Sequence, residues 1–286
     1  MVLSVLCSST VTFSMVLARK RFGQHFLEPV WVEKVVRAID PQPDEMFVEI
    51  GPGRGALTRP LAARARSVVA YEIDRDLASA LRATAPPNLT IVEGDFLATA
   101  DSRLGTTDSR LPTTDSIRVA GNLPYNVASP ILFALTEAFV RGAPIGDATL
   151  MLQREVADRL MAHPGSKDYG VLTILIGHSA DVERVLDLPP GAFRPPPKVH
   201  SALVRLRFHA ADPPVRDREI FARLVQAVFT RRRKTLANAL AAYRSRLARS
   251  IPELLASVAI DGGRRPETLS IAEFGRLADA YSADVT

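Results

Sequence analysis

The segment MFVEIGPGRGALT (46–58) joins a short apolar run to a Gly-x-Gly-x-Gly turn and then to a stretch compatible with a helix. The apolar run has the length and residue types of one buried strand. Glycines such as Gly51 and Gly53 let the backbone approach a ligand closely, and free N–H groups at a helix start favour anionic groups. A strand, a glycine turn and a helix in this order predict a nucleotide-binding unit of an α/β fold. The turn alone does not establish binding, because purely structural turns share its pattern.

Short apolar runs and helix-compatible stretches continue to alternate along the chain. Strands are predicted at 46–50, 67–73, 89–95, 117–122 and 149–153. Between them, apolar residues recur every three or four positions, which predicts helices at 56–65, 75–84 and 129–140. Strands that alternate with helices form a mostly parallel sheet with right-handed crossovers. The predicted fold class is therefore α/β, with a doubly wound, mostly parallel sheet.

The pattern changes in the last third of the chain. The segment 186–208 is rich in proline and then alternates apolar with basic residues. This alternation is typical of a strand with one more solvent-exposed face. From Asp212 onward the pattern is helical, at 218–229, 234–258 and 271–281. We therefore predict a large domain at 19–208 and a small all-α domain at 209–286.

Two segments do not fit these domains. Residues 1–18 carry no charge, and a basic cluster follows them, whereas a signal peptide has its positive charge before the apolar run. Six Ser or Thr residues among these eighteen argue against a membrane span. We interpret 1–18 as a non-essential extension from an upstream start.

Residues 101–116 contain the near-duplicates DSRLGTT and DSRLPTT, whose polar composition with Gly and Pro predicts a surface loop.

Composition narrows the function classes. The formal net charge of +5 favours a polyanionic partner only weakly. The single cysteine, Cys7, excludes an intrachain disulfide framework and favours a reducing compartment, so we expect a cytoplasmic protein. The five histidines show no metal-ligand spacing, so no metal site is predicted. No Gly-x-Ser-x-Gly motif occurs, and hydrolase chemistry of that type has no support.

Two acidic residues close the second and third predicted strands. Glu72 lies where a carboxylate can accept hydrogen bonds from two vicinal ribose hydroxyls. Asp95 lies where a carboxylate can accept from the amino group of an adenine, with Ile73 and Phe96 against the faces of the base. Together with the glycine turn these acids predict a nucleoside pocket. They do not separate a dinucleotide from S-adenosylmethionine.

The fourth predicted strand ends in Asn122-Leu123-Pro124-Tyr125, close to where the reactive end of a cofactor should lie. An amine on an aromatic base is a poor nucleophile because its lone pair is delocalised. The Asn122 side-chain carbonyl and the Leu123 backbone carbonyl can accept its hydrogens and free that lone pair. Pro124 fixes the turn, and Tyr125 offers a flat face for a base extruded from its helix. The motif favours methyl transfer from S-adenosylmethionine to a base amine by positioning, without a dedicated general base.

Nine stretches between Arg19 and Tyr281 carry a family likeness: RKRFGQHFL, EIGPGRGALT, YEID, EGDF, GNLPYN, LQREVADRL, FRPPPKVHSALVRL, RRKTLANAL and LSIAEF. With them the chain resembles the ribosomal RNA adenine N6,N6-dimethyltransferase family, specifically its small-subunit dimethyladenosine transferases. The resemblance implies a Rossmann-like methyltransferase domain that uses S-adenosylmethionine, followed by a helical domain. It implies dimethylation of two adjacent adenosines in the 3′-terminal hairpin loop of small-subunit (16S) rRNA, late in subunit assembly.

The resemblance also implies roles for single residues. The segment Gln24-His25-Phe26-Leu27 is expected to close over the methionine part of the cofactor, with His25 and Leu27 in contact. The other cofactor contacts that carry over are Gly51, Glu72, Asp95 and Asn122. The sequence departs from the commonest family pattern at His25, His200 and Arg231, which stand in place of Asn, Asp and Gln.

Two basic clusters are candidate RNA contacts because they could grip phosphates. They are Arg19, Lys20 and Arg21 near one terminus and Arg231, Arg232, Arg233 and Lys234 in the small domain. The expected partner is small-subunit rRNA in an assembling particle, and nothing in the sequence requires more than a monomer.

Three other functions fit parts of the sequence. Related enzymes that dimethylate a large-subunit rRNA adenine share the pocket, but RRKTLANAL (232–240) and the helical tail resemble the small-subunit enzymes. A non-catalytic RNA-binding assembly factor would not need an intact Asn-Leu-Pro-Tyr. An NAD-dependent dehydrogenase would need a catalytic acid–base residue, which the end of the fourth strand does not provide.

Overall fold

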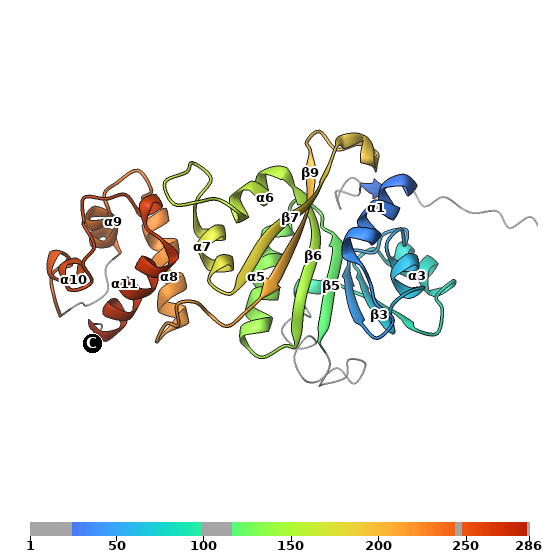
Figure 1. The fold of residues 1–286 in the computed structure, drawn as a ribbon, viewed down its shortest axis with the longest axis horizontal. Helices are drawn as coiled ribbons and strands as arrows, with labels where there is room; N and C mark the ends of the chain where they lie inside the picture. Colours follow the sequence, from blue (N-terminus) through green and yellow to red (C-terminus); the bar gives the residue numbers. More distant parts are fainter. Residues whose placement is uncertain (1–24, 99–115, 244–247, 285–286) are drawn as a thin grey trace, which may run out of the picture.

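The structure is a computed structural model that describes residues 25–98, 116–243 and 248–284. A sheet with its covering helices forms one end of the molecule, and a group of helices forms the other (Figure 1). Some predicted features lie outside the described residues, namely the extension at 1–18, the basic cluster Arg19–Arg21, Gln24 and the duplicated stretch 101–114.

The main sheet has the strand order β4-β3-β2-β5-β6-β9-β7. Its strands are β2 Met46–Ile50, β3 Ser67–Glu72, β4 Leu89–Glu93, β5 Ile117–Asn122, β6 Ile145–Gln153, β7 Ala180–Leu188 and β9 Ser201–Phe208. Neighbouring strands from β4 to β6 are parallel, whereas β9 pairs antiparallel with both β6 and β7. The predicted mostly parallel sheet is confirmed.

The five predicted strands are present, with differences at their ends. β4 ends at Glu93, so the prediction that Asp95 closes this strand is wrong by two residues. The chain leaves the sheet at Gly94, whose φ is 150° and whose N–H donates to the Glu72 carbonyl oxygen. The sequence pattern does not indicate β7, because this strand mixes charged and apolar residues and is only partly buried.

Helices pack against both faces of the sheet. They are α1 Pro29–Ile39, α2 Thr58–Ala62, α3 Arg75–Arg82, α5 Ala128–Val140, α6 Arg154–Leu160 and α7 Val171–Gly177. Successive residues of a strand point to opposite faces. In β2, Val48 and Ile50 therefore join the core that includes α5 and α6, while Phe47 joins the core that includes α1, α2 and α3. The sheet is thus doubly wound.

The C-terminal helices are α8 Arg218–Phe229, α9 Leu236–Ala242, α10 Ile251–Ser257 and α11 Ile271–Asp284. The starts of α8, α9 and α10 are fixed by Asp217, Thr235 and Ser250, whose side chains accept backbone N–H groups of the first turn. The predicted helical stretch 234–258 is therefore two helices, α9 and α10. Across the described ranges, no helix is long and apolar enough to cross a membrane.

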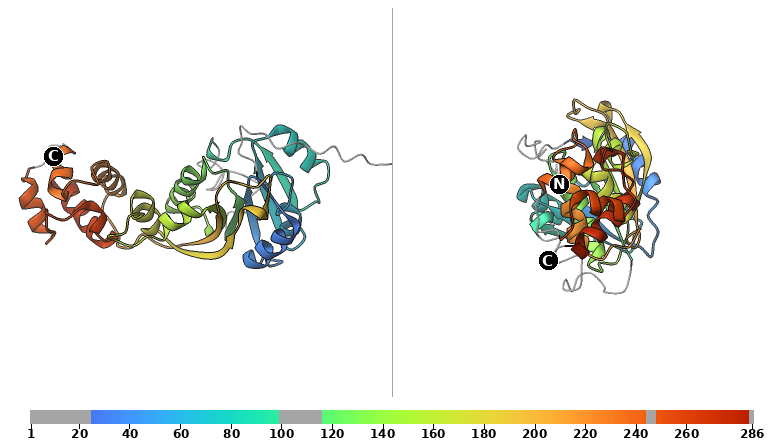
Figure 2. Two further views of the ribbon diagram at one scale, coloured as in Figure 1. Left: turned by 90° about the horizontal axis from the view of Figure 1, so that it is seen from above. Right: turned by 90° about the vertical axis from the view of Figure 1, so that its left-hand side faces the viewer.

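The core of the C-terminal helices also includes residues that precede them. Tyr169, Ile174 and Leu175, in and before α7, belong to the same buried cluster as α8 to α11. Figure 2 shows α7 next to these helices, between them and the sheet. The domain boundary at residue 209 stays a prediction, since apolar packing crosses it.

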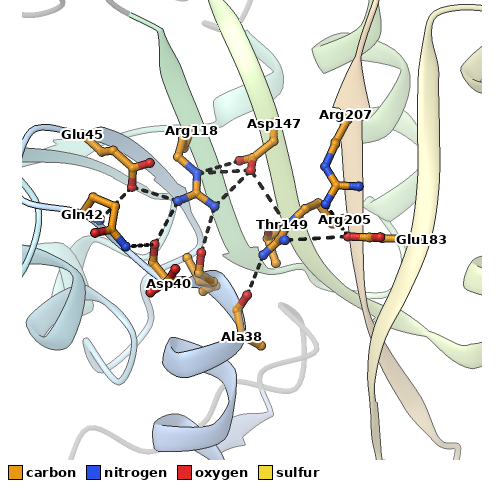
Figure 3. A network of polar contacts seen from close by, with 11 residues as sticks. Ala38, Asp40, Gln42, Glu45, Arg118, Asp147, Thr149, Glu183, Arg205 and Arg207 are labelled. Carbon is orange, nitrogen blue, oxygen red and sulfur yellow. Dashed lines mark hydrogen bonds and ion pairs between the residues drawn. The ribbon is translucent and has the colours of Figure 1, made fainter.

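A network of charges lies at the amino ends of β5 and β6 (Figure 3). The Arg118 side chain, 13% exposed, donates from Nε to Asp147 Oδ1 at 3.0 Å and from Nη1 to Glu45 Oε2 at 2.8 Å. Its guanidinium also donates to the carbonyl oxygens of Ile39 at 2.8 Å and Asp40 at 3.2 Å. The network continues through Arg205, Glu183 and Arg207 on β9 and β7. It ties α1 to the middle of the sheet.

Candidate active site

A cavity of about 190 Å³ opens at the carboxyl ends of β2, β3 and β5 and beside the turn after β4. All the predicted cofactor residues that the structure describes line it: His25, Leu27, Gly51, Gly53, Glu72, Ile73, Asp95, Phe96 and Asn122. The predicted catalytic residues Asn122, Leu123, Pro124 and Tyr125 line it as well. Parallel strands bring their carboxyl ends to one edge of a sheet, which is why residues from four strand ends meet there.

The glycine turn forms one wall of the cavity. Gly51 has a φ of 69° and donates its N–H to the Tyr71 carbonyl oxygen at 3.0 Å. Gly53 has a φ of 58°, and a Cβ atom there would lie 3.1 Å from the Phe26 ring. Only glycine adopts this backbone at low cost, and its missing side chain leaves room for the segment that covers the turn.

Glu72 connects the glycine turn to the start of α3. Its Oε2 accepts the Gly53 N–H at 2.9 Å and its Oε1 accepts the Asp74 N–H at 2.8 Å. Burial raises the pKa of this carboxyl, and the two backbone N–H groups oppose the increase. Each carboxylate oxygen has two lone pairs, so both keep acceptor capacity for a ligand. Glu72 thus holds the glycine turn and the start of α3 in place, and it can also accept hydrogen bonds from a bound molecule.

The predicted base-binding residues follow β3 and β4. Asp95 accepts the Leu97 N–H at Oδ1, at 2.9 Å. Phe96 is buried and meets the Tyr71 ring edge-on, with the ring centroids 5.5 Å apart. Ile73 is half exposed, at 50%, and is free to cover a flat ligand. An acceptor next to one buried and one exposed apolar side chain suits an adenine ring.

Residues 25–27 lie over the cavity because a distant strand holds them. β1, Phe26–Leu27, pairs antiparallel with β8, Phe193–Arg194. One ring nitrogen of His25, Nδ1, lies 2.7 Å from the Pro195 carbonyl oxygen. The family resemblance implies that His25 and Leu27 contact the cofactor, but it did not predict the pairing of β1 with β8.

Asn122 is oriented by the same segment. Its amide nitrogen, Nδ2, donates to the His25 backbone carbonyl at 2.8 Å. Since the amide nitrogen takes this acceptor, Oδ1 is the remaining polar atom and faces away from that contact. The Leu123 N–H donates to the Met151 carbonyl at 3.3 Å, and the Leu123 carbonyl accepts no hydrogen bond from the described residues. Asn122 and Leu123 both line the cavity, so their two oxygens are candidate acceptors for a ligand there.

Tyr125 stands beside these acceptors. Its ring stacks on the His25 ring, with centroids 5.6 Å apart and an angle of 26° between the planes. Its hydroxyl lies 2.9 Å from Ser201 Oγ. Burial raises the pKa of the Tyr125 hydroxyl, and the Ser201 contact opposes this increase. The Tyr125 phenol is therefore neutral at physiological pH. His25 and Ser201 hold its flat ring in place at the cavity wall.

Three residues of the site were not found by sequence reasoning. Glu49 lines the cavity from β2, Arg54 lies over the Phe26 ring at 4.2 Å, and Ser201 holds Tyr125. The sequence does contain a signal for Glu49, since it is the one charged residue in the otherwise apolar run 46–50, all of which is buried. No local signal links Ser201 to Tyr125, because the two residues are far apart in the chain.

The basic residues predicted to contact RNA differ from one another in their surroundings. Arg232 pairs with Glu267 and donates to the Ser166 carbonyl at 3.1 Å, so it links the turn after α8 to the segments before α7 and before α11. Arg231, Arg233 and Lys234 are exposed. These residues lie between α8 and α9, away from the cavity lining. Within the described ranges, no cluster of three or more His, Cys, Asp or Glu residues could hold a metal ion.

A protein-family model described as ribosomal RNA adenine dimethylase matches residues 15–281. The chain belongs to the ribosomal RNA adenine dimethylase family. It is therefore a methyltransferase, and its reaction consumes a methyl donor. A relative from Thiobacillus denitrificans, named ribosomal RNA small subunit methyltransferase A, is 46% identical and covers 93% of this chain and 98% of its own. A relative of the same name from Leptothrix cholodnii is 43% identical over 92% of each chain.

Two solved structures share the fold of this family member. A dimethyladenosine transferase from Plasmodium falciparum superposes with a TM-score of 0.71 at 24% identity, covering 88% of this chain and 96% of its own. The 23S rRNA methyltransferase ErmE superposes with a TM-score of 0.59 at 28% identity, covering 90% of this chain and 99% of its own. The expected Rossmann-like methyltransferase fold with a C-terminal helical region is confirmed.

Proposed function

We propose that this chain transfers methyl groups from S-adenosylmethionine to N6 of two adjacent adenosines in the 3′-terminal hairpin loop of small-subunit rRNA, giving N6,N6-dimethyladenosine. The observation that carries the proposal is the Asn122 amide, which the His25 carbonyl orients at the cavity wall. The relatives named small-subunit methyltransferases are 41–46% identical over nearly the whole chain, against 28% for the 23S enzyme. The rRNA would be met in an assembling particle, by a monomer.

The cavity suits S-adenosylmethionine in charge and in shape. Glu49 and Glu72 are both buried, and Glu49 Oε2 has no hydrogen-bond partner among the described residues, so it is available to a polar or cationic group of a ligand. The glycine turn leaves space that a Cβ at Gly53 would fill. Asp95 and Ile73 provide an acceptor and an apolar cover for adenine. When bound, this donor supplies a methyl group on a positively charged sulfur, which is already activated for transfer.

The protein's own contribution is to prepare the target amine. The Asn122 Oδ1 and the Leu123 carbonyl accept its two hydrogens, which draws the nitrogen toward tetrahedral geometry and exposes its lone pair. Pro124 has no N–H group and a restricted φ, so the two acceptors are held before the base arrives. The methylated amine loses its proton to water, and no side chain needs to act as a general base. Positioning supplies most of the acceleration.

Substitutions of Tyr125 separate the stacking role of its ring from its hydrogen bond. Tyr125→Phe keeps the flat surface and removes only the contact with Ser201, so kcat/KM for RNA should change by less than about fivefold. Tyr125→Ala removes the ring and should lower kcat/KM about 10- to 100-fold, mainly through KM. Initial rates against RNA concentration measure both effects. Equal losses in the two variants would contradict stacking on the target base.

The exposed basic residues after α8 are expected to contact rRNA phosphates. Replacing Arg231, Arg233 and Lys234 together by Gln should reduce the slope of log affinity against log salt by about 2 to 3, because each phosphate contact contributes roughly 0.7 to 0.9. Binding to small-subunit RNA over a series of salt concentrations measures the slope. Arg232→Gln is the matched comparison: it should lower the thermal midpoint, since Glu267 loses its partner, and leave the slope unchanged. A slope unaltered in the triple variant would count against an RNA contact here.

One experiment tests the proposed substrate against its rivals. The protein is incubated with labelled S-adenosylmethionine and under-methylated small subunits, large subunits or bare DNA, and the modified nucleoside is identified after digestion. Label in dimethyladenosine from small subunits alone is the expected result. Label in large-subunit RNA would instead support the activity in the name of the 23S enzyme, and no label with RNA bound would support a non-catalytic assembly factor.

A further inference from the structure

Glu49 is a buried carboxyl group in the cavity wall to which sequence reasoning gave no role. It lies in β2, with Ala70 of β3 and Ala120 of β5 as its neighbours in the sheet, and only 2% of the residue is exposed. Its Oε2 has no hydrogen-bond partner in the part of the chain that the structure describes. A buried carboxyl oxygen without a partner is costly, so the position is expected to meet a group that the described residues do not provide.

Among the described residues, no cation around the cavity is paired with Glu49, although other charged or titratable groups line it. They are His25, Arg54, Tyr71, Glu72, Asp95 and Tyr125. Arg54 lies over the Phe26 ring, and the neighbouring charge that acts on Glu49 is the carboxylate of Glu72. Burial raises the pKa of Glu49 to about 8, Glu72 adds to the increase, and the Thr58 hydroxyl opposes it. Without a ligand, Glu49 therefore holds a proton at pH 7.

We propose that Glu49 is the counter-ion of the methyl donor, and that its carboxyl proton leaves to solvent when the donor binds. The proposal rests on the proposed function, in that the donor is S-adenosylmethionine. This donor carries a sulfonium and an ammonium against one carboxylate and so brings a net positive charge. Release of one proton from Glu49 keeps the total charge of the pocket constant, which avoids burying an uncompensated cation.

The exchange makes donor binding depend on pH in a defined direction. The empty pocket has the higher Glu49 pKa and the loaded pocket the lower one, so deprotonation favours binding. The affinity for the donor should rise with pH, by at most about tenfold per unit, until pH passes the empty-pocket value near 8. Above that pH the carboxylate is already charged, and the contribution of Glu49 levels off.

Isothermal titration of S-adenosylmethionine into the full-length protein at pH 7, in buffers of different ionisation enthalpy, counts the protons released. We expect close to one proton for the wild type and close to zero for Glu49→Gln, with the affinity of the variant lower by about tenfold. Glu93→Gln is the matched control: Glu93 ends β4, which β3 separates from β2, its side chain is 39% exposed, and the variant should release protons like the wild type. Equal release by the wild type and Glu49→Gln would overturn the proposal.

A second measurement needs no substitution. Carbon-13 NMR of the glutamate carboxyl groups in the wild type should show one group titrating near pH 8, whose midpoint falls by at least about one unit when S-adenosylmethionine saturates the protein. A midpoint that does not move would refute the exchange while leaving donor binding intact. Failure of the donor to bind at all would instead refute the cofactor assignment of the proposed function.

Discussion

Replacing Asn122 by alanine is expected to lower kcat for adenine methylation by at least about 100-fold, the usual loss for one preorganised group that acts on the transition state. The substitution removes the Oδ1 acceptor and leaves the His25 carbonyl without its donor. Under the proposed mechanism, the lone pair of the adenine nitrogen then stays delocalised in the ring, although the methyl donor is still bound. Single-turnover rates with under-methylated small subunits and saturating S-adenosylmethionine measure the chemical step directly.

The control for this prediction is Asn238→Ala. Asn238 is exposed on α9, and the same atoms are removed there without touching the cavity. Its rate should stay within about twofold of the wild type, since isolated surface changes have small effects. RNA affinity should remain within a few-fold for both variants. A rate near that of the wild type for Asn122→Ala would show that the amine is not activated by acceptors at this position.

Replacing Arg118 by alanine should lower the free energy of unfolding by about 3–5 kcal/mol, the usual cost of removing one partner of a buried ion pair. The Arg118 side chain is 13% exposed and holds two carboxylates, those of Glu45 and Asp147, which are 26% and 17% exposed (Figure 3). Both would lose their shared partner, and two carbonyl oxygens at the end of α1 would lose a donor. Urea denaturation at pH 7 and 25 °C measures the change.

Arg37→Ala is the matched control for the network. Arg37 pairs with Glu33 on the surface of α1, where the two side chains are 81% and 75% exposed. Such exposed pairs contribute about 0–1 kcal/mol, so the control should leave stability nearly unchanged. Because Arg118 lies at the amino end of β5 and Asn122 at its carboxyl end, the folded Arg118→Ala protein should keep the wild-type KM. Similar stability losses in both variants would mean that burial does not strengthen the Arg118 pairs.

Local pattern was enough to predict the parts of this fold that depend on short segments. β2 and the glycine turn, Glu72 and the Asn122 loop follow from apolar runs and from residue types needed at strand ends. The end of the strand before Asp95 was predicted two residues too late, because a single glycine, Gly94, turns the chain out of the sheet. Such a turn leaves no periodic signal.

What could not be predicted depends on contacts between distant segments. The β1–β8 pairing places Phe26 opposite Arg194, and neither segment contains a sequence pattern that predicts its partner. Arg232 stands in a basic run that is typical of a phosphate contact, but it pairs with Glu267 in the folded chain. The helical core takes in Tyr169, which precedes the change in composition used to place the domain boundary.

The link from His25 to both Asn122 and Tyr125 has a consequence for turnover. The backbone carbonyl of His25 accepts a hydrogen bond from the Asn122 amide, and the His25 ring stacks on the Tyr125 ring. Any motion that lifts residues 25–27 to let a spent donor leave also withdraws both supports. The orientation of the Asn122 amide and the stacking on Tyr125 therefore both depend on residues 25–27 lying over the cavity.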